Sequence, residues 1–313
     1  MKKLVSIIIP AYNEEKSLPL LHLNICKTIE DIIDYDFEIL FVNDGSIDKT
    51  QEVIEKIYAS DKKVAFIELS RNFGKESAML AGLDHVKGDC AIIIDADLQH
   101  PPLVMKEMIK KWELGYEDVY AERESRGKES FIRRKLTMIY YKILQKTAHI
   151  DVLPNVGDFR LLDRKCIDSI KKLRETQRYT KGLFCWIGFK KDKVVFSQGD
   201  RLEGKSSFNY FNLFNLAVEG ITSYTTIPLR IATILGFLTG FGAIIYLVWT
   251  LVKVMIWGDP VAGFPTIICV ILFLGSIQLL CIGILGEYLA RIFNESKHRP
   301  NYIITNYKEK EYS

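Results

Sequence analysis

Asp95 and Asp97 stand directly after an aliphatic run at residues 92–94, and Gln99 follows two residues later. Such a run predicts a buried parallel strand. The carboxyl ends of these strands face the crevice in which open α/β sheets bind ligands. Two carboxylates there suit Mg²⁺ or Mn²⁺ shared with a diphosphate. Taken alone, an Asp-x-Asp is better explained as a turn with solvated aspartates, so a metal site needs support from the rest of the chain.

The first 121 residues alternate short apolar runs with segments of helical periodicity. This alternation predicts an α/β fold with a mostly parallel sheet and right-handed crossovers. The turn after the first run lacks G-x-G-x-x-G, which disfavours a dinucleotide site. The expected strands are residues 4–9, 37–42, 64–69, 91–94 and 119–121.

Polar side chains gather at the ends of four successive predicted strands. They lie in residues 10–15, 43–50, 70–75 and 95–97. Any one of these groups is explained by helix capping, because Ser, Asp and Asn are good N-cap residues. Four together are hard to attribute to capping alone, and we expect them to converge on one edge of the sheet.

The segment from 122 to 205 departs from this alternation. The sequence predicts a charged loop at residues 122–128 and a basic amphipathic helix at residues 131–149. That helix either lies on a membrane surface or packs on the sheet with a solvated basic face. Short strands are expected at residues 159–162 and 194–196.

Two long uncharged segments follow, residues 231–252 and 265–286. As helices of about 33 Å, each matches a hydrocarbon core of about 30 Å. Lysine and arginine flank the pair but are scarce in the connection between the spans, so a multi-pass protein of the cytoplasmic (inner) membrane with both termini cytosolic is expected. The predicted division is a catalytic domain (1–205), an amphipathic juxtamembrane segment (206–230), two transmembrane helices with an external hairpin (231–288) and a cytosolic tail (289–313).

Composition excludes several other classes of protein. A hydrophobic share of 48% and a charged share of 26% exclude wholesale disorder. The net charge of +3 is too small to argue for nucleic acid as a partner. The six cysteines form no C-x-x-C pair, and the five histidines show no zinc spacing, so free thiols in a reducing compartment are expected. A G-x-x-x-G at Gly236 and Gly240 would permit helix packing and a homo-oligomer.

Four stretches of the chain resemble family 2 glycosyltransferases of the GT-A fold. Two later stretches and the two spans narrow the resemblance to polyprenyl-phosphate glycosyltransferases, the group of bactoprenol glucosyltransferases and dolichyl-phosphate mannose synthases. The match runs in the same order through nearly the whole chain and leaves out only the last dozen residues. The stretches are 5–15 (Val-Ser-Ile-Ile-Ile-Pro-Ala-Tyr-Asn-Glu-Glu), 42–46 (Val-Asn-Asp-Gly-Ser), 71–75 (Arg-Asn-Phe-Gly-Lys), 95–99 (Asp-Ala-Asp-Leu-Gln), 157–161 (Gly-Asp-Phe-Arg-Leu) and 201–206 (Arg-Leu-Glu-Gly-Lys-Ser).

The resemblance implies a binding site for a UDP-sugar donor. It places Pro10, Tyr12, Glu14 and Asp44 around the uridine, with Asp44 accepting a hydrogen bond from the uracil. Lys75 lies where a positive charge approaches the donor, although a surface lysine near a helix start is an equal alternative.

The same resemblance implies a divalent metal, Mg²⁺ or Mn²⁺, at the Asp-Ala-Asp. Asp97 would bind the metal directly, Asp95 would lie near the ribose and the metal, and Gln99 would complete the coordination sphere. A metal there neutralises the departing diphosphate and acts as a Lewis acid.

The charge of the acceptor predicts which residues would bind it. A polyprenyl monophosphate has a second pKa of about 6, so at neutral pH it is already an anionic nucleophile. The enzyme then needs cations to place it more than a base to activate it. The candidates are Arg123, Arg134, Arg201 and Lys205, and for the first two a solvated face is the alternative. The resemblance puts Asp158 near the acceptor, where orienting the cations or shaping the sugar site is favoured over a role as base.

The predicted function is inverting transfer of a sugar from UDP-sugar to undecaprenyl phosphate on the cytosolic leaflet, for glycosylation of the cell envelope. Glucose is the first choice of sugar, with N-acetylglucosamine or another sugar as the alternative. A processive polysaccharide synthase of the same fold is disfavoured, because Gln177-Arg178-Tyr179 lacks the Gln-x-x-Arg-Trp acceptor spacing. A non-catalytic scaffold that binds a nucleotide sugar is disfavoured by the acidic residues retained at the donor site.

Overall fold

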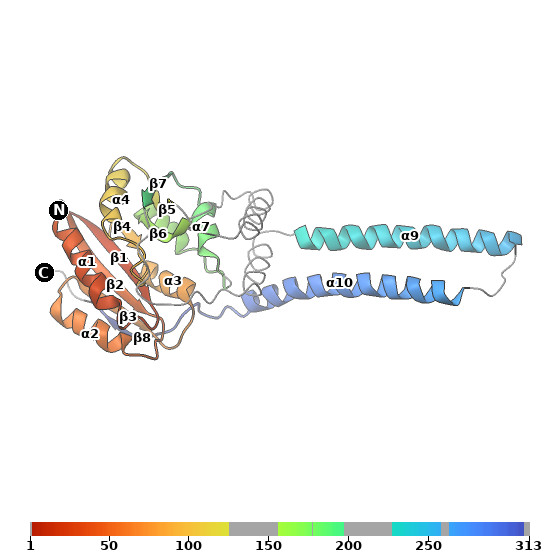
Figure 1. Ribbon diagram of the computed structural model, residues 1–313, viewed down its shortest axis with the longest axis horizontal. Helices are drawn as coiled ribbons and strands as arrows, with labels where there is room; N and C mark the ends of the chain where they lie inside the picture. Colours follow the sequence, from red (N-terminus) through yellow and green to blue (C-terminus); the bar gives the residue numbers. More distant parts are fainter. Residues whose placement is uncertain (1, 125–155, 177, 197–226, 258–262, 310–313) are drawn as a thin grey trace. The chain divides into compact units, whose positions relative to one another are not determined.

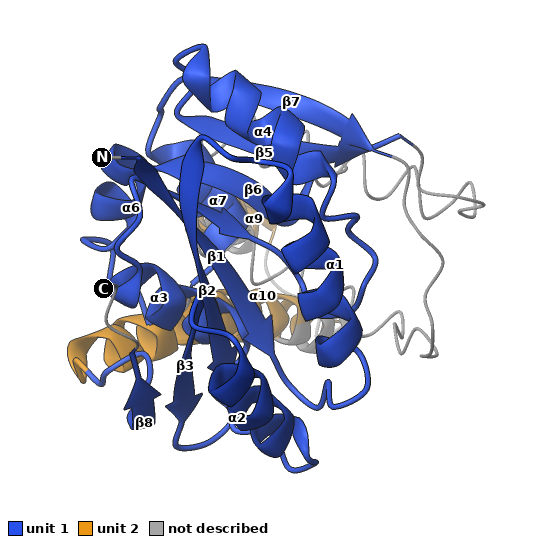
Figure 2. Cartoon of the chain, turned by 90° about the vertical axis from the view of Figure 1, so that its left-hand side faces the viewer, with its two compact units in different colours: residues 1–145, 149–209, 299–313 blue, residues 146–148, 210–298 orange. Residues whose placement is uncertain are grey.

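The computed structural model describes residues 2–124, 156–176, 178–196, 227–257 and 263–309. These fall into two compact units (Figure 2). The first unit contains the described residues up to 196 together with residues 299–309, and the second contains residues 227–257 and 263–298. The predicted basic helix at 131–149 and almost all of the juxtamembrane segment at 206–230 lie outside the described residues.

The first unit is built on a mixed sheet of eight strands in the order β7-β5-β6-β4-β1-β2-β3-β8 (Figure 1). Four of the seven pairings are parallel, and they include the central β4-β1-β2-β3 set. The pairings of β4 with β6, β5 with β6 and β3 with β8 are antiparallel. The strands are β1 (Lys3–Ala11), β2 (Tyr35–Asn43), β3 (Val64–Leu69), β4 (Cys90–Ile93), β5 (Asp118–Arg123), β6 (Val156–Asp163), β7 (Lys191–Phe196) and β8 (Ile304–Lys308).

Helices cover both faces of this sheet. The helices of the first unit are α1 (Leu18–Glu30), α2 (Thr50–Ser60), α3 (Lys75–His85), α4 (Val104–Glu113), α6 (Arg164–Ile170) and α7 (Thr180–Trp186). Side chains of α1, α2 and α4 belong to one buried cluster, and those of α3, α6 and α7 belong to another. Alternate residues of β1 belong to the two clusters. Ile7 and Ile9 lie in the first cluster, and Ile8 lies in the second. Burial on both faces explains why the central strands are continuous aliphatic runs.

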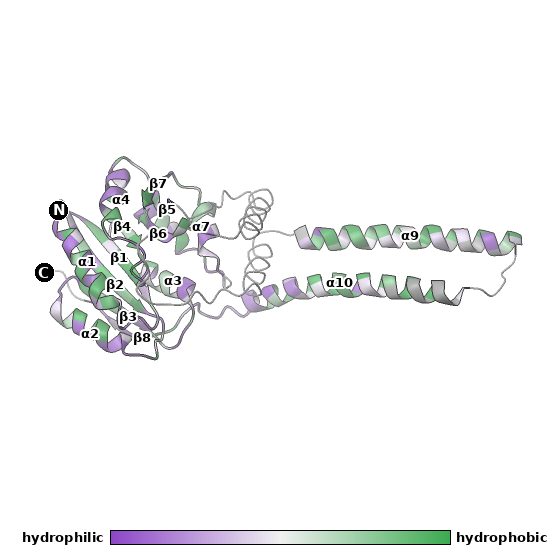
Figure 3. Cartoon of the chain, viewed as in Figure 1, coloured by the Kyte–Doolittle hydropathy of each residue, from purple (hydrophilic) through white to green (hydrophobic). Residues whose placement is uncertain are grey.

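The second unit consists of two long helices, α9 (Ile227–Trp257) and α10 (Phe264–Ser296). Both are candidate membrane spans, with windows Pro228–Tyr246 and Phe273–Ser296 of mean hydropathy 1.7 and 1.6. Apolar residues run along both helices (Figure 3). Large side chains such as Phe237, Trp249 and Phe273 are more than half exposed, which is expected of surfaces made for lipid. The Cys281 thiol donates to the Ala232 carbonyl at 3.5 Å and so connects the two helices.

The C-terminal segment differs from the expected tail at residues 289–313. Helix α10 continues to Ser296, and β8 then pairs antiparallel with β3. The Tyr302 hydroxyl donates to Asp84 at 2.6 Å, and the Ser70 amide donates to the Ile303 carbonyl at 2.9 Å. The added strand covers hydrogen-bonding groups that β3 would otherwise expose as a sheet edge. A five-residue strand at the end of a chain has too little periodicity to be predicted.

Candidate active site

A pocket of about 290 Å³ opens where the strand order reverses between β1 and β4. Crevices at such switch points, outside the carboxyl ends of the strands, are where doubly wound sheets bind ligands. The pocket brings together all six residues predicted for the donor, as well as Asp97. Its lining is Pro10, Ala11, Tyr12, Glu14, Asp44, Asn72, Gly74, Lys75, Ala78, Asp95, Ala96 and Asp97.

Asp44 braces the loop that leads into α3. Its two carboxylate oxygens accept from the backbone amides of Phe73 at 2.8 Å and Gly74 at 2.9 Å. Burial raises the pKa of Asp44, and these two hydrogen bonds oppose the rise. The next residue, Gly45, has a φ of 64°, and a Cβ there would lie 2.3 Å from the Arg71 carbonyl carbon. Only glycine allows the two loops to approach so closely.

The loop after β1 is held against the loop after β2. The Asn13 amide donates to Ser46 Oγ at 3.0 Å, and the Glu14 amide donates to Thr50 Oγ1 at 2.8 Å. Tyr12 is 42% exposed at the pocket, so its ring is available to a planar ligand. Burial, followed by repulsion from Asp97 and other carboxylates, raises the pKa of Glu14. The pocket therefore concentrates negative charge and suits a cation.

Asp95, Asp97 and His100 offer ligand atoms that all lie within 4.8 Å of one another. His100 is buried between Phe159 and Phe196, and its Nδ1 lies 3.8 Å from Asp95 Oδ2. Nδ1 has no hydrogen-bond partner in the described part of the chain. Carboxylate oxygens joined by one imidazole fit Mg²⁺ or Mn²⁺.

The turn that carries these ligands has an unusual backbone. Leu98 has a φ of 61°, a left-handed conformation that a leucine seldom adopts. Such strain collects at ligand sites, where the surrounding structure maintains it. The Gln99 amide donates to Asp97 Oδ1 at 3.1 Å, and Gln99 itself is buried beside the pocket. The predicted metal set thus lies in one turn, and His100 is a further candidate ligand that the sequence reasoning missed.

Lys75 connects the two sides of the site. Its Nζ lies 2.6 Å from Asp95 Oδ1 and 2.6 Å from Asp158 Oδ2, which is carried by β6. Burial lowers the pKa of Lys75, but Asp95 and then Asp158 outweigh this, so the pKa is raised. For Asp158 burial raises the pKa, but Lys75, together with the charges of Lys181 and Arg160, outweighs this, so its pKa is lowered. Asp158 is therefore an anion that a cation holds in place, which fits an orienting role better than that of a base.

A second layer of polar contacts, also missed from the sequence, supports this bridge. Thr180 at the start of α7 donates its amide to Glu76 Oε2 at 3.0 Å, and its hydroxyl donates to the same oxygen. Burial and then the Asp158 charge raise the pKa of Glu76 to about 7. The Arg160 guanidinium lies against the Phe184 ring and pairs with buried Asp118.

The predicted acceptor cations are described only in part. Arg123 ends β5 and pairs with Phe196 of β7, whose ring packs against His100, so it lies on the metal side of the site. Arg134, Arg201 and Lys205 lie outside the described residues. Lys181, at the start of α7, is a further cation whose charge reaches Asp158.

Comparison with known proteins agrees with this architecture. Residues 6–171 match the glycosyl transferase family 2 model, and residues 227–292 match the GtrB C-terminal hairpin. A bactoprenol glucosyl transferase of Shigella phage SfV is 42% identical over 98% of this chain and 99% of its own. CsbB of Bacillus subtilis is 45% identical over 96% of this chain and 91% of its own.

Solved structures are more distant. Glucosyl-3-phosphoglycerate synthase from Mycobacterium tuberculosis, in complex with Mn²⁺, UDP-glucose and phosphoglyceric acid, has 18% identity and a TM-score of 0.47 over 70% of this chain and 78% of its own. The family assignment depends instead on the family models and on the full-length relatives. With the pocket at the sheet edge and the apolar helical hairpin that follows, they show that the chain belongs to glycosyl transferase family 2.

Proposed function

We propose that this protein transfers a sugar, glucose in the first instance, from a UDP-sugar to undecaprenyl phosphate at the cytosolic face of the membrane. The observation that carries the proposal is the Asp95-Ala96-Asp97 turn at the pocket, in a chain that also bears two candidate spans. Relatives named bactoprenol glucosyl transferase, at 40–42% identity over nearly the full length, support the lipid acceptor.

The donor would occupy the pocket between the loops after β1, β2 and β4. Tyr12 offers a face for the uracil ring, and the Asp44 carboxylate has lone pairs left to accept from it. Helix α3 begins at the pocket, and the positive end of its helix dipole favours the negative charge of a diphosphate. Asp95 and Asp97, with Gln99 and His100 beside them, would hold the divalent metal. When bound, that metal supplies Lewis-acid stabilisation of the departing diphosphate.

The acceptor phosphate is already ionised at neutral pH, so no protein base has to remove a proton from it. Its oxygen attacks C1 of the sugar on the face opposite to UDP. The new C1–O bond forms as the bond to the diphosphate breaks, and UDP leaves with the electron pair. The configuration at C1 is therefore inverted. Arg123, Arg134, Arg201 and Lys205 are proposed to bind the acceptor phosphate, because arginine suits bidentate phosphate contacts.

Asp158 is proposed as an orienting group for this step. Lys75 holds its Oδ2, and the described residues provide no hydrogen-bond partner for its buried Oδ1. A sugar hydroxyl of the donor can donate to that oxygen. Lys75 would meanwhile shield the incoming phosphate from the carboxylates of Asp95 and Asp158. It would also keep Asp95 in place.

The proposed membrane topology has both termini on the cytosolic face. Strand β8 pairs with β3, so the chain returns to its first unit after α9 and α10. If both helices cross the bilayer, an even number of crossings puts both ends on one face. The positive-inside rule assigns that face to the cytosol, because lysines and arginines flank the pair and are scarce in the connection between the spans.

The decisive experiment incubates membranes containing the full chain with undecaprenyl phosphate and a panel of UDP-sugars, and takes the mass of the lipid product. We expect one product, one hexose heavier than the acceptor, that depends on a divalent cation. An N-acetylhexosamine product would support the alternative sugar. A water-soluble polymer would support the processive synthase, and binding of UDP without any product would support the scaffold.

Asp97→Asn provides the first test of the site. Losing one direct metal ligand should lower the rate of transfer at least about 100-fold, since even supporting groups around a metal change activity 10–100-fold. The matched control is Asp31→Asn, which removes an exposed aspartate paired with Lys106 and should leave transfer unchanged. Full activity of Asp97→Asn would overturn its role as a metal ligand.

A further inference from the structure

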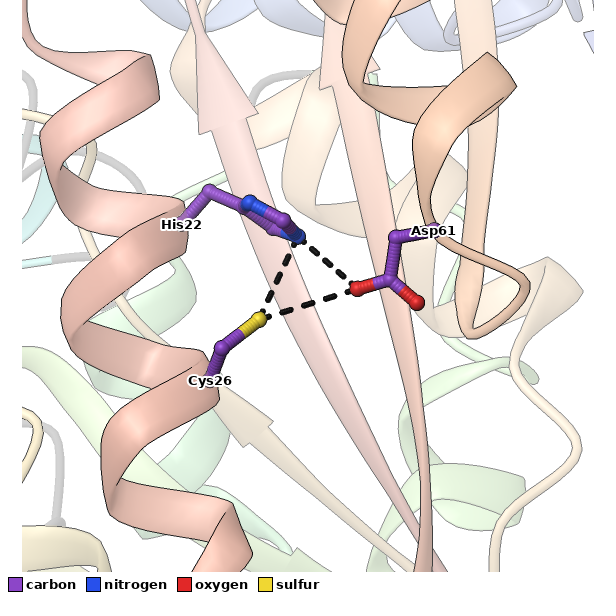
Figure 4. Close-up of side chains that lie close together, drawn as sticks. All are labelled: His22, Cys26 and Asp61. Carbon is purple, nitrogen blue, oxygen red and sulfur yellow. Dashed lines mark hydrogen bonds and ion pairs between the residues drawn. The ribbon is translucent and has the colours of Figure 1, made fainter.

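A second group of potential ligands lies away from the pocket, between α1 and the end of α2 (Figure 4). His22 Nε2 lies 2.9 Å from Asp61 Oδ2, and Cys26 Sγ lies 3.4 Å from the same nitrogen. The third edge of this triangle, from Cys26 Sγ to Asp61 Oδ2, is 3.6 Å. Three different side chains from two elements thus present one donor atom each to a common point.

Local structure holds each donor in this position. His22 and Cys26 are four residues apart on α1 and therefore share one face of the helix. The His22 ring packs against Phe41 of β2. Asp61 follows α2, and its Oδ1 accepts from the Lys63 amide at 2.9 Å, which turns Oδ2 toward α1. The side chains of His22 and Asp61 are 17% and 20% exposed, so the group is sheltered but within reach of solvent.

The dimensions of the triangle are close to those of a tetrahedral zinc site. Zinc bonds of about 2.0–2.1 Å to nitrogen, 2.3 Å to sulfur and 2.0–2.2 Å to oxygen, at tetrahedral angles, put the ligand atoms about 3.3–3.6 Å apart. Two of the three edges fall at this spacing, and the third is shorter by about 0.4 Å. We propose that His22, Cys26 and Asp61 bind Zn²⁺, with water at the fourth position.

The chemistry of the donors excludes a merely electrostatic cation site. A thiolate ligand selects Zn²⁺ over Mg²⁺, which prefers oxygen. Binding therefore transfers the thiol proton to solvent as the sulfur–zinc bond forms. One thiolate and one carboxylate then balance the two charges of the ion, which leaves a neutral site.

The proposed ion would clamp α1 to α2. These two helices start from the loops that line the donor pocket, and both pack on the same face of the sheet. The sequence shows no zinc spacing here, because a single His-x-x-x-Cys is uninformative. The third ligand lies 35 residues further along the chain from Cys26, and only the fold brings it close.

Cobalt is the probe for this site, because a thiolate bonded to Co²⁺ gives a near-ultraviolet charge-transfer band that oxygen ligands do not give. The full chain in detergent, with excess Mg²⁺ present, is titrated with Co²⁺ and then with Zn²⁺. We expect the absorbance of the band to saturate at one equivalent of Co²⁺ in the wild type and to disappear when Zn²⁺ displaces Co²⁺. Zn²⁺ should also raise the unfolding temperature of the wild type, since a ligand of the folded state stabilises it.

Variants separate this site from any other thiol. Cys26→Ser should abolish the band, and Asp61→Asn and His22→Gln should each weaken binding at least about 10-fold. The matched control is Cys185→Ser, which removes another half-buried free thiol and should leave the band intact. Unfolding of each metal-free variant verifies that it is folded. A wild type without the band, or a Cys26→Ser variant that retains it, would overturn the proposal.

Discussion

At the scale of single residues, one ammonium group organises the site. Lys75 pairs with both Asp95, which follows β4, and Asp158, which lies near the start of β6. A cation already committed to Asp95 leaves Asp97 as the carboxylate most open to a metal ion. This arrangement gives a physical reason to rank Asp97 above Asp95 as metal ligand.

Replacing Lys75 by glutamine should lower kcat/KM for transfer about 100-fold, a loss comparable to that of one preorganised electrostatic group in an active site. The physical reason is that two neighbouring carboxylates would lose the cation between them. Steady-state kinetics with separate variation of donor and acceptor would measure it.

Lys75→Arg retains the charge and should recover part of the activity, whereas Lys106→Gln removes a lysine from a surface pair with Asp31 and should have no effect. Wild-type kinetics in Lys75→Gln would show that the bridge is only structural. In that case Asp158 would be free to act alone.

Glu76 predicts a particular pH dependence of stability. Its pKa is about 7 in the folded chain against an ordinary 4.5, because burial and Asp158 disfavour the charged form. The folded state therefore holds this proton more tightly than the unfolded state does. The contribution of Glu76 to the free energy of unfolding is fully present below pH 4.5 and is lost as the pH rises through about 7.

Glu76→Gln should accordingly lose less stability than the wild type between pH 5 and pH 8. Thermal unfolding of the full chain in detergent at the two pH values measures the difference. Exposed Glu52 on α2 offers a control, and Glu52→Gln should follow the wild type. Equal slopes for Glu76→Gln and the wild type would contradict the assignment.

At the scale of elements, β8 is the largest difference between the observed fold and the one expected from the sequence. The Tyr302 hydroxyl meets Asp84 at the end of α3, where Arg174 also pairs with Asp84 at 2.7 and 2.8 Å. The rings of Tyr302 and Tyr307 both lie on His85. The last described residues of the chain are thus hydrogen-bonded and packed against the helix that begins at the pocket.

Tyr302→Phe should destabilise the first unit by about 1–2 kcal/mol, since it removes a hydrogen bond to a charged group and keeps the ring. Unfolding of the full chain by urea would measure the change. Tyr307→Phe keeps the same packing against His85 and should cost less than about 0.5 kcal/mol. A larger loss for Tyr307→Phe than for Tyr302→Phe would show that the hydrogen bond to Asp84 is not what fastens β8.

At the scale of the whole molecule, the two ends of the chain belong to one unit, and two apolar helices separate them. An epitope tag inserted after Asp259, in the connection between the helices, should be cleaved by external protease in spheroplasts. A tag at the C-terminus should be cleaved only after the membrane is opened. The opposite pattern would reverse the proposed orientation, and cleavage of both tags in intact spheroplasts would refute a spanning hairpin.

The sequence by itself determined the α/β class, the two long apolar helices and the position of the polar turns after the strands, whereas the residues assigned to the donor came from the family resemblance. It could do so because these signals are local: aliphatic runs mark buried strands, and turns at carboxyl ends of parallel strands must share one sheet edge. All six residues predicted for the donor line one pocket. The predicted acceptor residues Arg134, Arg201 and Lys205 remain predictions, because they lie outside the described residues.

Only the tertiary structure decided which side chains touch. The Lys75–Asp158 pair spans 83 residues, and the Tyr302–Asp84 contact spans 218. No periodicity records such pairs, because they depend on strand order and helix packing rather than on local propensity. The turn with Asp95 and Asp97 could be located from the sequence. That Lys75 pairs with Asp95, and that the His100 ring lies beside it, follows only from the packing of α3 and β6 against β4.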